Sequence, residues 1–119
     1  MPLPPTSTPM SHYQEGDLAR FGEITKDAPE LGEKFFAWYG AVFEDGALTA
    51  REKSLIALAV AHAVQCAYCI EAYTEETLKK GCDPEQQMEA VHVASAIRGG
   101  ASLVHAVQMR RKASDLGMG

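Results

Sequence analysis

Two cysteines separated by two residues are the part of this sequence with the most evident chemistry. Cys66 and Cys69 lie three positions apart, so on one turn of a helix their thiols can close a disulfide with little backbone movement. If a helix begins near Cys66, its free amides and its dipole stabilise a thiolate there. The spacing therefore favours a dithiol that cycles between a reduced and an oxidised form.

Two other interpretations of the cysteines stay open at this point. The pair could be half of a zinc site, completed by Cys82 or by one of the histidines His62, His92 and His105. Alternatively, both thiols could be inert, because free cysteine often packs as a small apolar side chain. No second CxxC or HxxxH pair accompanies the motif, and no strand-helix-strand pattern surrounds it, which disfavours a thioredoxin fold.

Reduction of a peroxide by this pair requires a proton donor as well as a nucleophile. One thiolate attacks the O–O bond and becomes a sulfenic acid, the second thiol condenses with it, and the leaving oxygen takes a proton. Candidate residues near the pair are His62, Glu71 and Tyr73. His62 lies four positions before Cys66, one turn away if the helix continues, although a histidine on an apolar helix also packs in cores.

Helices must position these side chains, because apolar residues recur every three to four positions with Gly and Pro between the segments. We expect a loosely packed tail over residues 1–12 and a single all-α domain of about six helices over residues 13–119. The predicted helices cover residues 15–25, 29–43, 49–65, 66–80 and 83–98, with a last one from about residue 101 to the basic stretch at 110–112.

Capping residues and glycines mark the predicted helix boundaries. Thr49 and Glu52 predict a capping box, and Asp83 followed by Pro84 and Gln86 predicts another helix start. Gly81 and the pair Gly99-Gly100 predict helix ends.

Two predicted helices carry apolar residues on more than one face. In residues 29–43 the first stripe is Leu31, Phe35, Trp38 and Val42, and the second is Phe36, Tyr39 and Phe43. Residues 83–98 also satisfy the helical spacing on two faces. In a small domain this pattern indicates burial against another subunit.

The composition argues against several classes of function. With 119 residues, 46% of them hydrophobic, we expect one compact domain with a radius of gyration of about 13 Å. A net charge of −5 leaves no large basic patch for nucleic acid, and the longest apolar run, 55–61, is too short for a membrane span. Residues 1–10 show no targeting signal, so we expect a cytoplasmic protein.

The chain resembles a known family over most of its length after residue 48. Residues 48–60 (LTAREKSLIALAV), followed by the CAYC at 66–69, resemble the carboxymuconolactone decarboxylase superfamily and its alkylhydroperoxidase D-like proteins. Residues 62–74 (HAVQCAYCIEAYT) and 89–109 (EAVHVASAIRGGASLVHAVQM) are similar to the arsenosugar biosynthesis-associated peroxidase-like subgroup.

This resemblance implies an all-helical fold, assembly as a homotrimer or homohexamer, and thiol peroxidase chemistry. It implies Cys69 as the cysteine that attacks the peroxide and Cys66 as the resolving cysteine. The family's proton relay uses a glutamate 12 residues before the first cysteine and a histidine four after the second, where this sequence has Ser54 and Tyr73. Because tyrosine, with a pKa of about 10, is a poor base, we hypothesise that His62 takes this role.

We therefore expect a cytoplasmic enzyme that reduces a hydroperoxide through Cys69 and Cys66, with His62 and Tyr73 as further candidate catalytic residues. An external thiol or dithiol would return the pair to its reduced form. We expect no cofactor, no bound metal, and neither nucleic acid nor membrane as a partner. A link to arsenic metabolism belongs to this expected enzyme function. The alternatives are a protein that binds arsenite or zinc through the cysteines, a lactone decarboxylase, which the cysteine pair weighs against, and an assembly module without chemistry.

Overall fold

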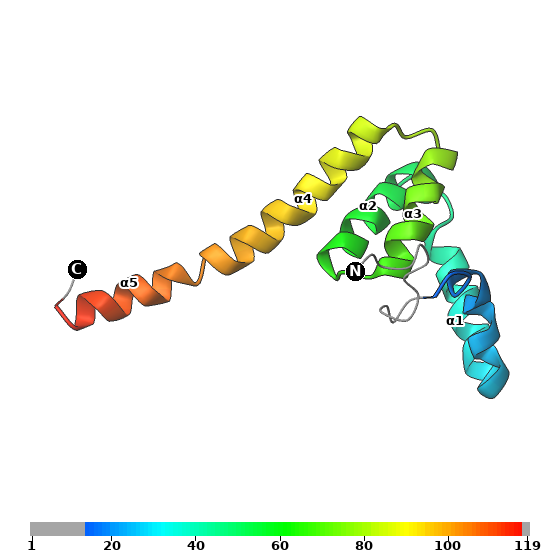
Figure 1. Ribbon diagram of the computed structural model, residues 1–119, viewed down its shortest axis with the longest axis horizontal. Helices are drawn as coiled ribbons and strands as arrows, with labels where there is room; N and C mark the ends of the chain where they lie inside the picture. Colours follow the sequence, from blue (N-terminus) through cyan, green and yellow to red (C-terminus); the bar gives the residue numbers. More distant parts are fainter. Residues whose placement is uncertain (1–13, 118–119) are drawn as a thin grey trace, which may run out of the picture.

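The computed structural model describes residues 14–117, and its regular elements over that range are all helical (Figure 1). They follow in the order η2 (Leu18–Asp27), a 3-10 helix, then α1 (Pro29–Val42), α2 (Ala50–Ala63), α3 (Ala67–Lys79), α4 (Pro84–Leu103) and α5 (Ala106–Asp115). The predicted all-α fold class is confirmed. The tail expected over residues 1–12 lies outside the described residues.

The predicted helix starts are placed by the expected side chains. Pro29 is in the first turn of α1. The Thr49 hydroxyl accepts the Glu52 amide at 3.0 Å, and the Glu52 carboxylate accepts the Thr49 amide at 2.8 Å. Asp83 and Gln86 form a second reciprocal pair at the start of α4, with distances of 2.8 and 2.9 Å. Both pairs satisfy amides that have no partner within the helix.

Two of the predicted helices have other boundaries in the structure. The first helix is a 3-10 helix that begins and ends later than the predicted α-helix at 15–25. The helix predicted to end at Gly99-Gly100 continues to Leu103, and the chain bends at Val104 and His105 instead. Glycine inside a helix costs roughly 1 kcal/mol relative to alanine but does not forbid helical angles. Neither of these glycines has a positive φ, whereas Gly81, which follows α3 as predicted, has a φ of 86°.

Helix α2 is the centre of the fold, because it packs against both α3 and α4. The buried side chains at this junction are Ser54, Leu58, Ala61, Thr77, Cys82 and Ala94. The buried Thr77 hydroxyl accepts a hydrogen bond from the Gln87 side chain at 2.8 Å, which ties α3 to α4. This three-helix unit holds the first turn of α3, where the cysteines lie.

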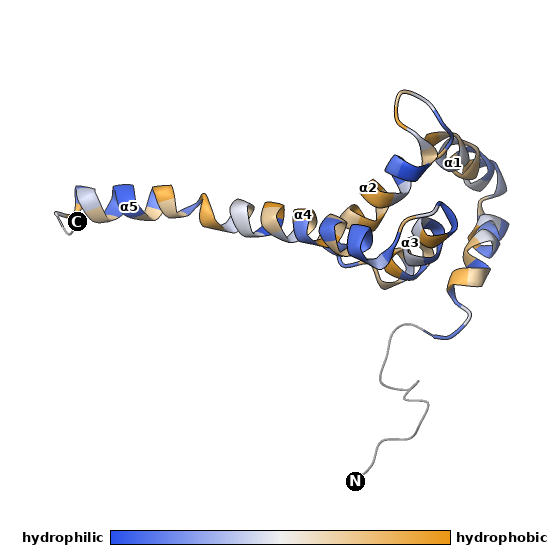
Figure 2. Cartoon of the chain, turned by 90° about the horizontal axis from the view of Figure 1, so that it is seen from above, coloured by the Kyte–Doolittle hydropathy of each residue, from blue (hydrophilic) through white to orange (hydrophobic). Residues whose placement is uncertain are grey.

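The end of α4 and all of α5 extend away from this unit as an arm (Figures 1 and 2). The radius of gyration is therefore 20.0 Å, so the expectation of about 13 Å for a compact chain is wrong. Apolar side chains of the arm remain exposed, among them Ile97 at 69% and Val107 at 65%. On α1, the stripe of Leu31, Phe35, Trp38 and Val42 is exposed as well. A single copy of the chain thus leaves uncovered the second apolar faces that its sequence predicts to be buried.

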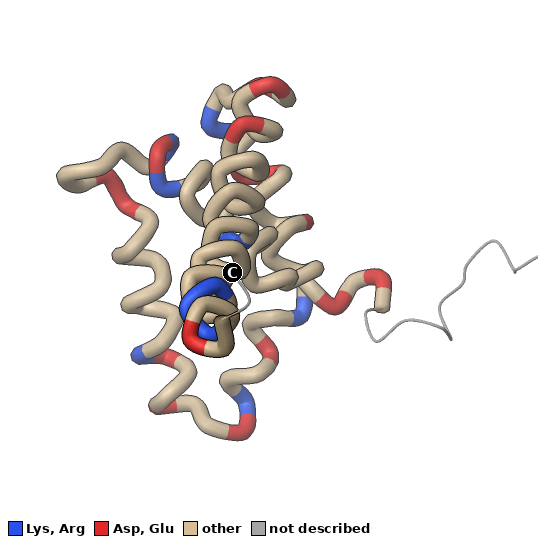
Figure 3. The backbone as a smooth tube through the Cα atoms, turned by 90° about the vertical axis from the view of Figure 1, so that its left-hand side faces the viewer, with Lys and Arg blue, Asp and Glu red and all other residues tan. Residues whose placement is uncertain are grey.

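Charged side chains are spread over the helices, with a basic stretch at residues 110–112 on α5 (Figure 3). Within residues 14–117, no helix is both long enough and apolar enough to cross a membrane.

Candidate active site

A sharp change of direction between α2 and α3 places Cys66 at the start of a helix. Gln65 has a φ of 57°, a left-handed conformation that side chains other than glycine adopt rarely. Cys66 is extended and forms the N-cap of α3. The predicted helix start at the cysteine motif is confirmed within one residue. The assumption that one continuous helix joins His62 to Cys66 is wrong, because α2 ends at Ala63.

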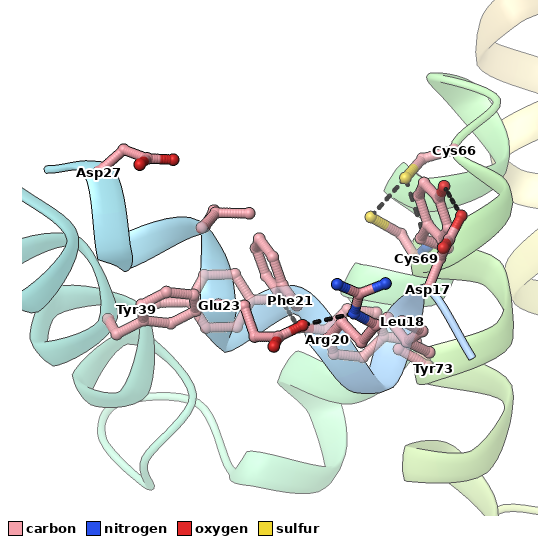
Figure 4. Close-up of a pocket in the computed structure, with 14 residues that line it drawn as sticks. Asp17, Leu18, Arg20, Phe21, Glu23, Asp27, Tyr39, Cys66, Cys69 and Tyr73 are labelled. Atoms are coloured by element: carbon pink, nitrogen blue, oxygen red, sulfur yellow. Dashed lines mark hydrogen bonds and ion pairs between the residues drawn. The ribbon is translucent and has the colours of Figure 1, made fainter. Parts of the chain in front are cut away.

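The two thiols face each other at this helix start (Figure 4). Their sulfur atoms are 2.7 Å apart, and both cysteines are free and half-buried. The backbone amide of Cys69 donates to the Cys66 sulfur at 3.3 Å. A thiolate on Cys66 would therefore accept an amide hydrogen bond at the positive end of α3.

The surroundings of Cys69 have the opposite effect on ionisation. Burial above all, and then the hydrogen bond and the charge of Cys66, raise the pKa of the Cys69 thiol to about 11. Two negative charges at this separation repel each other strongly, so the two thiols do not both ionise readily. The amide hydrogen bond favours a charge on the Cys66 sulfur, and burial favours the proton on Cys69.

A cavity of about 690 Å³ lies beside the cysteine pair, and η2, α1 and α3 form its walls (Figure 4). Its apolar lining comes from Leu18, Phe21, Ile24, Phe36 and Ala72. Charged residues of η2, including the ion pair of Arg20 with Glu23, lie along the same cavity. This dithiol cavity has the size and the mainly apolar lining of a site for a small organic molecule.

A hydrogen bond from Tyr68 anchors the start of η2 over the pair. The Tyr68 hydroxyl donates to the Asp17 carboxylate at 2.8 Å, and the Gln14 amide donates to the same oxygen at 2.9 Å. The Gln14 amide and then the Tyr68 hydroxyl hold the pKa of Asp17 below its usual range. The residue between the two cysteines therefore joins the motif to the segment that covers it.

Tyr73, a predicted site residue, lies one turn after Cys69 and lines the dithiol cavity. Its hydroxyl shares a hydrogen bond with the hydroxyl of Tyr39 from α1. Burial, followed by this hydrogen bond, raises the pKa of Tyr73. The phenol therefore stays protonated and can act as an acid. Tyr39 was not predicted, because its position in an aromatic stripe indicates packing, and its hydroxyl was the one hint of another role.

The structure does not bring the other predicted side chains to the thiols. His62 is half-buried, its Nδ1–H donates to the Leu58 carbonyl at 2.8 Å, and it does not line the dithiol cavity. Cys82 is buried in the turn between α3 and α4. Three further candidates are exposed, namely Glu71, His92 and His105.

No three His, Cys, Asp or Glu side chains between residues 14 and 117 are grouped so that they could hold a metal ion.

Ser54, at the position where the resemblance expects a glutamate, is buried, and its hydroxyl donates to the Arg51 carbonyl at 2.7 Å. It lines a second cavity of about 330 Å³ together with Tyr39 and Tyr73. The two positions that depart from the family pattern, Ser54 and Tyr73, thus meet at the same place in the fold.

Comparison with known families decides the membership. Residues 29–111 match the model of the Carboxymuconolactone decarboxylase family. The chain belongs to this family. A family relative, the uncharacterized protein 4 in the cox locus of Paracoccus denitrificans, is 43% identical over 88 residues, which are 74% of this chain and 79% of the relative. A protein of Haemophilus influenzae is 41% identical over 56 residues, 47% of this chain and 50% of that protein.

Solved structures agree with the carboxymuconolactone decarboxylase fold. A Methanobacterium thermoautotrophicum protein superposes with a TM-score of 0.69 at 36% identity, over 72% of this chain and 97% of that one. A family protein of Legionella pneumophila gives a TM-score of 0.65 at 33% identity, over 85% and 90%. A Thermotoga maritima member, for which involvement in antioxidative response has been suggested, shares the fold at 21% identity with a TM-score of 0.53, over 84% and 97%.

Proposed function

We propose that this member of the family is a thiol peroxidase that reduces organic hydroperoxides with Cys66 and Cys69. The observation that carries the proposal is a pair of free thiols, 2.7 Å apart at a helix start, in the wall of a mainly apolar cavity. A dithiol is what two-electron reduction of a peroxide requires, because one sulfur is oxidised and the other resolves it. The same pair weighs against lactone decarboxylation, which has no need of thiols.

The first step transfers the oxidation to Cys69. The Cys69 thiol gives its proton to the Cys66 thiolate, and the Cys69 sulfur attacks the terminal oxygen of the hydroperoxide. The O–O bond breaks, Cys69 becomes a sulfenic acid, and the leaving alkoxide takes a proton from Tyr73 to become an alcohol. Proton transfer within the pair explains how a thiol whose pKa is about 11 can react at neutral pH.

The second step closes the pair and the third reopens it. The Cys66 sulfur displaces the sulfenic oxygen, which leaves as water with the Cys66 proton, and the Cys66–Cys69 disulfide forms. An external thiol or dithiol then reduces the disulfide by exchange and is itself oxidised. A cytoplasmic location belongs to this proposal, because cytosolic thiol reductants keep such a pair reduced.

Further copies of the chain are the partners that we propose for its exposed apolar faces. The arm of α4 and α5 and the outer stripe of α1 leave large apolar side chains in water. A helix that stands alone is marginally stable, and burial of its apolar face supplies what it lacks. A homotrimer or homohexamer, which the family resemblance implies, would cover these faces.

A thiol titration tests the proposed activity. The reduced protein, freed of reductant, is mixed with one equivalent of tert-butyl hydroperoxide, and free thiols and remaining peroxide are measured. We expect two thiols lost for each peroxide consumed. Cys69→Ser should consume none, Cys66→Ser should accumulate a sulfenic acid at Cys69, and Cys82→Ser, which changes a cysteine away from the cavity, should behave like the parent.

Two outcomes would count against the peroxidase. If the parent keeps its thiols in excess hydroperoxide, the chain is not a thiol peroxidase. If it then binds arsenite or zinc tightly and Cys66→Ser and Cys69→Ser abolish that binding, the soft-ion function replaces it. Such binding together with a normal peroxide reaction would add a link to arsenic metabolism without removing the enzyme.

A further inference from the structure

Two hydrogen-bonded tyrosines form the wall between the two cavities of the site. Tyr39, Ala72 and Tyr73 are the residues that line both the dithiol cavity and the smaller one. Of these three, only the tyrosines carry a polar side chain, and their hydroxyls are bonded to each other across the wall. Each phenol therefore belongs to a polar connection that runs from one cavity to the other.

Aromatic side chains from η2 and from the end of α1 hold the two rings in place. Phe43 stacks on Tyr73 with ring centres 5.3 Å apart and lies 5.2 Å from the ring of Tyr39. Phe21 of η2 meets the Tyr39 ring edge-on at 6.4 Å. Such packing fixes the rings without using their hydroxyls. The hydroxyl contact is therefore additional to what the core requires.

The two cavities differ in what they supply. The larger one contains the sulfur atoms, where a peroxide must bind to react. The smaller one contains the Ser54 hydroxyl and the ion pair of Glu76 with Lys80, whose charged atoms are 3.4 Å apart and partly exposed. The smaller cavity thus offers a route by which a proton from solvent can reach the tyrosines.

We propose that Tyr39 and Tyr73 form a proton relay between the two cavities, which rests on the peroxidase function proposed above. Tyr73 gives its proton to the alkoxide released when the O–O bond breaks, and the alcohol leaves neutral. Tyr39 passes its own proton to the Tyr73 phenolate and regains one from the side of Glu76 and Lys80. An alkoxide is a base comparable to hydroxide, so it takes a proton from a phenol even where burial raises the pKa of that phenol above its ordinary value of about 10.

The choice of oxidant separates proton donation from a structural role. tert-Butyl hydroperoxide releases an alkoxide that needs a proton, whereas peracetic acid releases acetate, a weak base that leaves without one. Single-turnover oxidation of the reduced thiols is measured with both oxidants for the parent, Tyr73→Phe and Tyr39→Phe. These substitutions keep the rings and remove the hydroxyls.

We expect Tyr73→Phe to lower the rate constant for tert-butyl hydroperoxide by about 100-fold or more, which is the usual contribution of a general acid. The same substitution should lower the rate constant for peracetic acid by less than about threefold. Tyr39→Phe should lower the rate constant for tert-butyl hydroperoxide by about tenfold, and it should again affect the reaction with peracetic acid much less. Tyr68→Phe removes a third phenol of the dithiol cavity and should leave the ratio of the two rate constants unchanged.

The outcomes keep the two proposals apart. The relay is wrong if the parent reacts with both oxidants and the tyrosine variants slow both reactions equally. It is also wrong if the variants slow neither reaction. In both cases the peroxidase function remains. Normal reaction with peracetic acid shows that a variant is folded with competent thiols. If the parent reacts with neither oxidant, the peroxidase function falls and the relay falls with it.

Discussion

At the scale of single residues, the CxxC motif looks symmetric in the sequence and is not symmetric in the structure. The Cys66 sulfur accepts an amide hydrogen bond at the helix start, whereas burial is the main cause that raises the pKa of Cys69 to about 11. A thiol with that pKa is ionised in roughly one molecule in ten thousand at pH 7. In the proposed mechanism, Cys69 therefore depends on Cys66 to take its proton.

The pH dependence of the Cys66→Ser variant tests this dependence. In this variant Cys69 must ionise alone, and burial, the largest cause of its raised pKa, remains, so the thiolate fraction grows as the pH rises. We expect the rate of sulfenic acid formation with tert-butyl hydroperoxide to rise about tenfold per pH unit between about pH 7 and pH 9. At neutral pH it should be at least about tenfold slower than in the parent, as measured by sulfenic acid trapping.

His62→Gln is the matched control, because the His62 side chain lies outside the dithiol cavity. The rate at which this variant reacts with tert-butyl hydroperoxide should stay within about threefold of the parent's rate. A flat pH profile for Cys66→Ser at the parent's rate would show that Cys69 ionises without help. A tenfold loss in His62→Gln would restore histidine as the base.

At the scale of elements, η2 completes the site, because it covers the cysteine pair and supplies one wall of the dithiol cavity. Its place on α1 depends on one glycine. A Cβ atom added at Gly32 would lie 2.5 Å from Thr25 Cγ2 and 2.9 Å from Thr25 Cα. The absence of a side chain at this position lets the two elements approach closely.

Gly32→Ala should therefore push η2 away from α1. We expect the free energy of unfolding to fall by about 1–3 kcal/mol, the usual cost of overpacking, and the reaction with hydroperoxide to slow as the cavity wall shifts. Urea unfolding gives the first quantity. Gly40→Ala in the same helix meets no atom within 4 Å and should stabilise the protein by about 0.5–1 kcal/mol. Equal effects of the two substitutions would contradict close packing at Gly32.

At the scale of the whole molecule, the arm of α4 and α5 is the surface on which we propose that a partner packs. Ile97, Leu103, Val104 and Val107 are more than half exposed on a helical arm that leaves the three-helix unit. Apolar surface of this extent in water is typical of an interface rather than of a monomer surface. In our proposal, the apolar side chains of the arm therefore pack against a neighbouring copy of the chain.

Ile97→Asp tests the arm directly. Light scattering coupled to size-exclusion chromatography should give the parent a mass of three or six times 12.9 kDa. Because an aspartate would bury an unpaired charge at the interface, the variant should dissociate to a smaller species. Thr74→Asp adds the same charge on α3, away from the arm, and should keep the parent's mass. A parent that runs as a monomer would overturn the assembly proposal.

Much of the fold followed from local sequence signals. Pro29 and the capping pairs Thr49 with Glu52 and Asp83 with Gln86 were predictable, because each depends on residues within a few positions of one another. Gly99-Gly100 misled the prediction, since glycine permits a break but does not force one. The direction of the arm was not predictable, because it depends on how α4 packs against α2, a contact between segments that are distant in the sequence.

The same division holds for the site. Short-range patterns were enough to predict the all-helical family fold and the position of Cys66 at a helix start. Two other features became visible only in three dimensions. Gln65 turns the chain between His62 and Cys66, and Tyr39 contacts Tyr73, 34 positions later. Contacts between distant segments depend on how the helices pack. The apolar spacing around Tyr39 is the same whether or not its hydroxyl has a hydrogen-bond partner, so the spacing does not predict this contact.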